Sequence, residues 1–164
     1  MLRVYYAGPI GGLEASEVRA RYKHLDDLVS EGSPQIWLPP LWETVEVIYP
    51  VASAELAEQG RLSGKGREDI PSITGKAITT RDKWWLISSD VLLADLRHNK
   101  DTASIGTIFE LSWAKDHDLH VVAIMDKDNP GVYDHPFVQH HIDVILPTPE
   151  EAVEYLRMLV KGKL

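Results

Sequence analysis

The 164-residue chain contains no cysteine. Disulfide bonds, thiol nucleophiles and thiolate metal ligands are therefore excluded, and the composition suits the reducing cytoplasm, where we expect the protein to work. The chain also lacks any apolar run near the ~20 residues that cross a bilayer, so we expect no membrane association. Residues 1–6 have the pattern of a β-strand and not that of a secretory signal peptide.

Positive charge is also scarce. Lysine and arginine number 17 against 25 aspartate and glutamate residues, which gives a formal net charge of −8. Proteins that bind nucleic-acid polymers gather lysine and arginine on one face, so we expect no such partner. A small anion is still compatible with this balance, because backbone amides at a helix N-terminus can bind it locally.

The common motifs of cofactor and metal sites are missing as well. The chain has no GxGxxG fingerprint, no phosphate-binding P-loop and no HExxH pair, and its seven histidines show no metal-ligand spacing. We therefore expect no cofactor and no metal. The histidines are expected at the surface or in loops.

Strand-type and helix-type segments alternate along the chain. Apolar runs typical of strands lie at 4–7, 35–38, 90–95, 119–125 and 142–145, and helical spacing lies at 13–29, from Thr79 or Thr80 to 88, 107–117 and 149–160. This order predicts one α/β domain over residues 1–164, with a doubly wound, Rossmann-like or flavodoxin-like parallel sheet of about five strands flanked by helices. Residues 41–75 lack a clear pattern and are predicted to form a variable flap that faces the substrate. A loop is predicted at 126–136.

The segment from Asp95 to Glu110 has the sequence of a ligand-binding turn. An apolar strand ends at Asp95, a polar loop follows, and Ser104 and Gly106 lead into a helix that carries Glu110. Ligands of open α/β sheets bind at the carboxyl ends of the strands, and glycine lets them approach the backbone. Two interpretations of Glu110 stay open: it faces a ligand and does chemistry, or it completes a capping box that begins at Thr107.

A second acid lies on an apolar stripe. Asp82 shares one helical face with Ile78, Trp85 and Leu86 by i+3 and i+4 spacing. A carboxyl with a raised pKa in such a place would be a natural general acid beside an ionised nucleophile. The alternative is an exposed acid that the dipole at the helix N-terminus favours.

Acids also flank the third predicted strand. Asp90 starts the strand and is typical of a solvated turn residue. Asp95 ends the strand on the ligand side of the sheet, where it either contacts the ligand or supports the site through hydrogen bonds.

The first strand–loop junction is Tyr5-Tyr6-Ala7-Gly8-Pro9-Ile10. Side chains alternate along a strand, so Tyr5 and Tyr6 must face opposite sides of the sheet, one in the core and the other able to reach a site. The glycine allows a ligand to lie close to the backbone.

Together these residues resemble the nucleoside 2-deoxyribosyltransferase family and its relatives, the 2'-deoxynucleoside 5'-monophosphate N-hydrolases. The similarity covers most of the chain but not Leu41 to Gly75. Its anchors are Tyr5-Tyr6-Ala7-Gly8-Pro9-Ile10, Asp82-x-x-Trp85-x-x-x-x-Asp90-Val91-x-x-Ala94-Asp95 and Ser104-x-Gly106-Thr107-x-x-Glu110-Leu111-x-Trp113-Ala114.

This resemblance implies a role for each anchor. Glu110 matches the nucleophile that forms a covalent deoxyribosyl-enzyme, Asp82 the acid that assists the leaving base, and Tyr5 the tyrosine near the nucleophile. Asp95 matches a supporting polar group. The substrate-binding positions that follow are Gly8, Pro9, Ile10, Asp95, Ser104 and Gly106.

One position departs from the classical transferases. They carry an aspartate six residues before the nucleophile, whereas this chain has Ser104, as in the monophosphate hydrolases, where the serine helps to hold the 5'-phosphate. A hydroxyl suits phosphate and an acid repels it. The resemblance also implies a homodimer or larger assembly, and the segment 126–141 is the candidate to complete the neighbouring subunit's site.

The sequence thus predicts an enzyme that cleaves the N-glycosidic bond of a 2'-deoxynucleoside or its 5'-monophosphate. Water as acceptor gives hydrolysis, and a second base gives transfer. The alternative is a non-catalytic nucleotide-binding or sensor module, which would keep Ser104 and Gly106 but would not need Glu110 and Asp82 together. A phospho-receiver with Asp90 and Asp95 around Mg²⁺ fits worse, because Ala7-Gly8-Pro9 stands where that fold needs acids.

Overall fold

The computed structural model describes residues 1–8, 13–31, 36–37, 74–97 and 103–162. Nearly all of the predicted flap at 41–75 lies outside these residues. Two of the predicted substrate-binding residues, Pro9 and Ile10, lie outside them as well.

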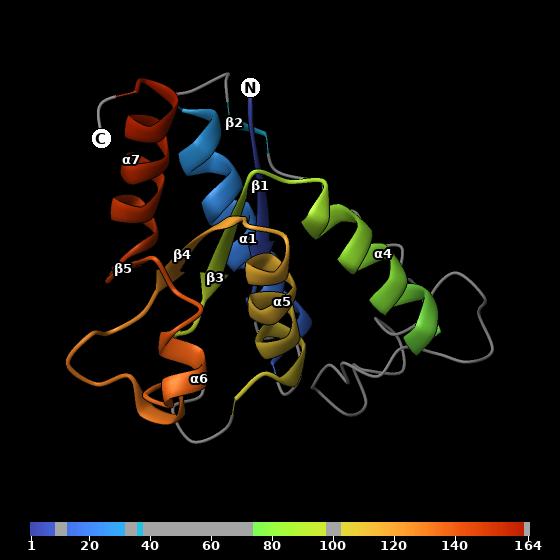
Figure 1. The fold of residues 1–164 in the computed structure, drawn as a ribbon. Coiled ribbons are helices and arrows are strands. Elements are labelled where there is room, and N and C mark those ends of the chain that lie inside the picture. Colours follow the sequence, from blue (N-terminus) through green and yellow to red (C-terminus); the bar gives the residue numbers. More distant parts are fainter. Residues whose placement is uncertain (9–12, 32–35, 38–73, 98–102, 163–164) are drawn as a thin grey trace.

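The described residues form five parallel strands in the order β2-β1-β3-β4-β5. The elements in chain order are β1 (Leu2–Ala7), α1 (Ala15–Ser30), β2 (Ile36–Trp37), α4 (Gly75–Ile87), β3 (Val91–Asp95), α5 (Ile105–Asp116), β4 (His120–Ile124), the 3-10 helix η2 (Gly131–Tyr133), α6 (Pro136–Gln139), β5 (Val144–Leu146) and α7 (Pro149–Val160) (Figure 1). The predicted α/β class is confirmed, and the order is the flavodoxin-like one. β2 pairs with β1 over only two residues.

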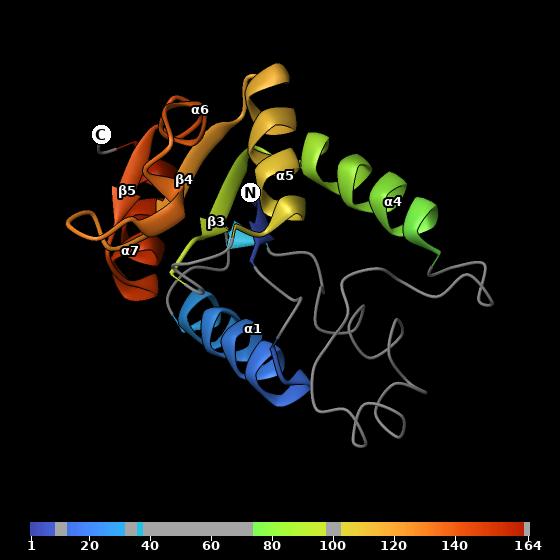
Figure 2. The ribbon, with the colours of Figure 1, turned by 90° about the horizontal axis from the view of Figure 1, so that it is seen from below.

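Helices cover both faces of the sheet. Figure 2 shows α1 and α7 on one face and α4 and α5 on the other. Such double coverage explains why β3 is buried along its whole length and has a continuous apolar sequence. The ligand-binding crevice of this strand order lies where the chain switches direction, between the carboxyl ends of β1 and β3.

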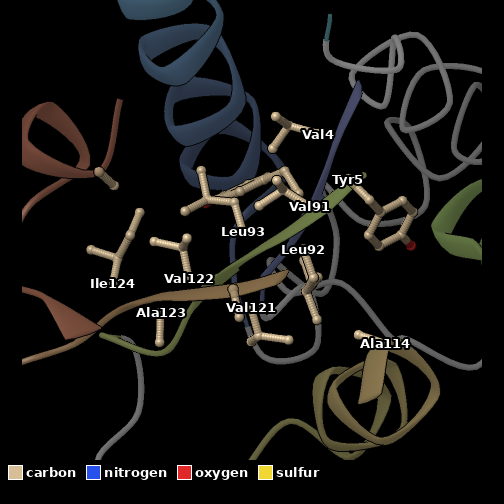
Figure 3. Close-up of a cluster of buried hydrophobic side chains, with 14 of the residues drawn as sticks. Val4, Tyr5, Val91, Leu92, Leu93, Ala114, Val121, Val122, Ala123 and Ile124 are labelled. Atoms are coloured by element: carbon tan, nitrogen blue, oxygen red, sulfur yellow. The ribbon is translucent and has the colours of Figure 1, made fainter. Parts of the chain in front are cut away.

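Alternation along the strands divides the core into two layers. Tyr5, Leu92 and Val121 stand in register across β1, β3 and β4. Figure 3 shows these three on the side of the sheet that carries α5, whereas Leu93 and Val122 point to the opposite side. Because Leu92 and Leu93 are both fully buried, each layer excludes water where it meets the sheet.

Two helices begin earlier than the sequence predicted. α5 starts at Ile105 and not at Thr107, because Ser104 is its N-cap and its hydroxyl accepts the Thr107 N–H at 3.4 Å. α4 starts at Gly75, because Thr74 is the cap. The Thr79 hydroxyl donates to the Gly75 carbonyl inside the helix, so the predicted cap at Thr79 or Thr80 was wrong.

The segment after β4 also differs from the predicted loop. It contains the short helix η2, and α6 follows with a proline at its start and His135 as its N-cap. β5 lies at Val144–Leu146, slightly later than predicted, whereas α7 matches the predicted range of 149–160. Within the described part of the chain, no helix has the length and apolar character needed to cross a membrane.

Candidate functional site

Tyr5 and Glu110 meet between β1 and α5. The Tyr5 hydroxyl donates a hydrogen bond to Oε1 of Glu110 at 2.8 Å. The contact arises because Tyr5 faces α5, while the next residue, Tyr6, faces α1 and packs edge-on against Tyr22. The capping-box interpretation of Glu110 was wrong, because α5 begins two residues before Thr107 and the Thr107 amide is held by Ser104.

Glu110 is in an unusual electrostatic environment. Burial raises the pKa of Glu110 and the negative charge of Asp82 raises it further, so that with all contributions included it lies at about 7. The hydrogen bond from Tyr5 acts in the opposite direction, because it stabilises the carboxylate.

Asp82 lies on α4, across from Glu110. Its side chain is 24% exposed and pairs with its neighbour Arg81, with 3.0 Å between Nη2 and Oδ1. Burial raises the pKa of Asp82, and the adjacent guanidinium partly offsets this effect. The predicted pair of carboxyl groups is thus brought together, and burial raises the pKa of both.

Both acids line one cavity of about 450 Å³ between α4 and α5. This volume is in the range of small-molecule sites. The predicted site residues that line it are Gly8, Asp82, Ser104, Gly106 and Glu110. Apolar side chains of Ile78, Phe109 and Trp113 form part of the wall. The arrangement combines two acids, a helix N-terminus and apolar surface within one opening.

Packing within the protein does not require glycine at either cavity position. A Cβ on Gly106 would have no atom of the described residues within 4 Å. A Cβ on Gly8 would lie 3.4 Å from the Tyr6 hydroxyl, which is an ordinary contact. The open space at Gly106 is therefore space that a ligand can use.

Asp95 belongs to a hydrogen-bonded cluster and not to the cavity wall formed by described residues. Its side chain is fully buried. The carboxylate accepts hydrogen bonds from the Tyr6 hydroxyl at 3.0 Å and from Nη2 and Nε of Arg97 at 2.7 and 3.0 Å. Burial alone would raise the pKa of Asp95, but the bonds and charge of Arg97 hold it below its usual value. This geometry favours the supporting role over direct ligand contact.

Asp90 lies at the opposite end of β3. It accepts hydrogen bonds from the Arg3 backbone at 2.8 Å and from the Arg3 side chain at 3.3 Å. It therefore joins the starts of β1 and β3, as expected of a turn residue. Among the described residues, no cluster of three acids or histidines could hold a metal ion.

Tyr133 is a site residue that the sequence did not indicate. Its hydroxyl accepts a hydrogen bond from the Ser104 N–H at 3.2 Å, at the start of α5. The segment 126–136 has no periodic pattern, and the only signal was a tyrosine soon after the carboxyl end of a strand. Arg81 was also missed, although its position next to Asp82 in the sequence was a signal.

Comparisons with known proteins add the fold alone. No protein-family model matches the chain, and no curated protein is significantly similar to it. A solved structure of a conserved protein from Enterococcus faecalis V583 is similar, with a TM-score of 0.59 and 17% sequence identity. The match covers 96% of this chain and 98% of that one.

Proposed function

We propose that the protein is an enzyme of the nucleoside 2-deoxyribosyltransferase type that cleaves the N-glycosidic bond of a 2'-deoxynucleoside or its 5'-monophosphate. The observation that carries this proposal is the Tyr5–Glu110 hydrogen bond in a cavity that Glu110 shares with Asp82. Most enzymes that cleave glycosidic bonds use a pair of carboxyl groups on either side of the bond, and here Tyr5 orients one of the two groups that line the opening.

The reaction follows from these two groups. The Glu110 carboxylate attacks the anomeric carbon as the bond to the base breaks, and an ester joins the sugar to Oε1 or Oε2 of Glu110. Protonated Asp82 gives its proton to the departing base. In the second step water, or another base, attacks the same carbon and releases Glu110 as a carboxylate. Asp82 takes back a proton from the attacking group.

The raised pKa of Glu110 is compatible with this role. Developing positive charge on the sugar stabilises the carboxylate, so the pKa falls as the transition state is approached. The Tyr5 hydroxyl contributes in the same direction throughout. The proposed nucleophile is thus ionised when it reacts.

The proposed site for the 5' end of the substrate is the start of α5. The Ser104 hydroxyl oxygen accepts bonds from the Thr107 N–H and from the Thr107 hydroxyl at 3.0 Å, which leaves its own proton to donate. A donor at a helix N-terminus suits a hydroxyl or a phosphate group. This supports a deoxynucleoside or deoxynucleotide as the substrate.

We further propose a homodimer or larger homo-oligomer in the cytoplasm. An apolar patch at the start of α5 and on α6 supports self-association, since Ile105, Phe109 and Phe137 are 74%, 56% and 77% exposed. Phe109 and Phe137 line one small cavity together, and Phe109 shares the larger cavity with Ile105. Exposed apolar surface of this kind is typical of protein interfaces.

A substrate panel tests the proposed activity. Deoxynucleosides and their 5'-monophosphates are incubated with the protein, each with and without a free acceptor base. Base release without acceptor indicates hydrolysis, and a new nucleoside or nucleotide indicates transfer. Glu110→Ala is expected to abolish both, whereas the control Glu154→Ala, at an exposed position on α7, is expected to keep wild-type rates. Binding of these compounds without base release would instead favour the nucleotide-binding module.

A further inference from the structure

One side chain of the segment after β4, that of Tyr133, contacts the start of α5. Tyr133 is the last residue of η2 and is only 1% exposed. Its hydroxyl accepts the Ser104 N–H at 3.2 Å, and its carbonyl accepts a bond from the Gln139 side chain at 2.9 Å. Tyr133 is thereby held between α6 and the N-cap of α5.

Ser104 lines the cavity, and two other residues of the protein form hydrogen bonds with it. Tyr133 engages its N–H, and Thr107 engages its hydroxyl oxygen. Among the described residues, no acceptor takes the N–H groups of Ile105 and Gly106 or the Ser104 hydroxyl proton. These three donors lie together in the first turn of α5, and the space at Gly106 is open.

The position of this turn relative to Glu110 matters for a bound sugar. Ser104 and Glu110 are six residues apart on one helix, a rise of about 9 Å along its axis. Both residues also line the same cavity, so a substrate with its anomeric carbon at Glu110 can direct its 5' end toward Ser104. Small shifts of the N-cap would then move the donors relative to the substrate while Glu110, held by Tyr5, stays in place.

We infer that Tyr133 is a positioning residue: its hydroxyl fixes the Ser104 N-cap so that the first turn of α5 meets the 5' end of the substrate. The inference rests on the proposed function for the identity of that substrate. It assigns to the segment 126–141 a role in its own subunit's site, in addition to the intersubunit role predicted from the sequence.

The phenol is suited to this task because it stays neutral. Burial raises the pKa of Tyr133, the bond from the Ser104 amide lowers it in part, and the negative charge of Asp95 raises it further. The hydroxyl therefore accepts the Ser104 N–H as an uncharged group at every pH near neutrality. Phenylalanine would keep the ring in its buried place and remove only the hydroxyl.

The test compares Tyr133→Phe with Tyr155→Phe on the full chain. Tyr155 is a matched control, since its hydroxyl is also bonded to a side chain, that of His120, at the first residue of β4 and away from the cavity. Calorimetric affinity and steady-state kinetics are measured for a deoxynucleoside and for its 5'-monophosphate.

For Tyr133→Phe we expect affinity for the monophosphate to fall about fivefold or more, with KM rising in parallel. The affinity for the nucleoside should fall less, and kcat should stay within about twofold of wild type, because Glu110 and Asp82 are untouched. Tyr155→Phe should match wild type. Unchanged affinity in Tyr133→Phe, or an equal loss for both compounds, would overturn the inference.

Two further outcomes separate this inference from the proposed function. If the wild-type protein binds monophosphates but releases no base, the proposed activity fails and the affinities alone decide the role of Tyr133. If it binds neither compound, the inference fails as well. If Tyr133→Phe does not fold, hydrogen exchange of the Ser104 amide is measured in the wild-type protein instead. Slow exchange that becomes slower when the monophosphate is added supports the inference. An exchange rate that the monophosphate leaves unchanged contradicts it.

Discussion

The hydroxyl of Tyr5 lies 2.8 Å from Oε1 of Glu110, so a residue of β1 contributes to the pKa of a carboxyl group on α5. Burial raises this pKa, the phenol lowers it by donating to the carboxylate, and the net value is about 7. Tyr5→Phe should therefore raise the pKa of Glu110. We expect kcat/KM at pH 7 to fall about tenfold and to recover in part at higher pH. A pH–rate profile measures the shift, and an unshifted profile would contradict the assigned role of Tyr5.

Glu110 also predicts a pH dependence of stability. The folded pKa of about 7 is above the ordinary value of 4.5, so the folded state binds this proton more tightly than the unfolded chain. The contribution of protonated Glu110 to the stability of the folded state is complete below pH 4.5 and is lost as the pH rises through about 7. Glu110→Gln removes the cost of burying an ionised carboxylate, and we expect it to raise the free energy of unfolding by about 1–2 kcal/mol at pH 8. Urea unfolding at pH 5 and pH 8 should show the larger gain at pH 8.

Asp82 can be tested through the leaving group. If Asp82 protonates the departing base, Asp82→Asn should slow cleavage of natural deoxynucleosides by about 10²–10⁴-fold. A deoxyribosyl compound whose leaving group needs no proton should lose much less. Equal losses for both compounds would indicate that Asp82 binds or positions the substrate. Asp116→Asn, at the last residue of α5, is the control.

Much of this site was predictable from the sequence, and the reasons are local. Glycine and apolar patterns placed Asp95 and the loop before Glu110 at the carboxyl edge of a parallel sheet, where the strand ends meet. The apolar stripe singled out Asp82, and the family resemblance predicted that Tyr5, Asp82 and Glu110 belong to one site. The helix starts were less predictable. Threonines at 79, 80 and 107 can all cap, and tertiary packing selected Thr74 and Ser104 in their place.

Other features depend on contacts between residues far apart in the chain. Tyr133 lies 29 residues from Ser104, and no period or motif connects them. Asp95 could be predicted at a strand end, but its bonds to Arg97 and Tyr6 could not. Burial, which raises the pKa of Glu110, is also set by the packing of several elements and not by nearby sequence.

Asp95 should be the main structural acid of this sheet edge. Asp95→Ala would leave the Tyr6 hydroxyl and Arg97 without their shared acceptor. Since Arg97 is 37% exposed and can be solvated, we expect a loss of about 2–3 kcal/mol in the free energy of unfolding. Because the folded pKa of Asp95 is lowered, its contribution is present above the ordinary pKa of 3.8 and is lost as the pH falls below it. Chemical denaturation measures both effects, and Asp90→Ala, at a more exposed pair, should lose about 0–1 kcal/mol.

The apolar patch of Ile105, Phe109 and Phe137 predicts the oligomeric state. Phe137→Asp places a charge in that patch without touching Glu110 or Asp82. We expect the wild-type protein to sediment as a dimer or larger and the variant to shift toward monomer. Trp84→Asp is the control, because Trp84 is 61% exposed on α4, away from the patch. A monomeric wild-type protein would contradict the proposed assembly.

Tyr5 and Tyr6 are consecutive residues of β1, yet they serve opposite faces of the sheet: one holds Glu110 and the other holds Asp95. Inserting or deleting one residue before them would exchange the two faces. Such a change would remove the hydrogen bond from Tyr5 to Glu110 and that from Tyr6 to Asp95 at the same time, so activity and stability would be lost together. Point substitutions at either tyrosine would separate the two losses. For redesign of this site, the length of β1 is fixed, whereas its side chains can be varied one at a time.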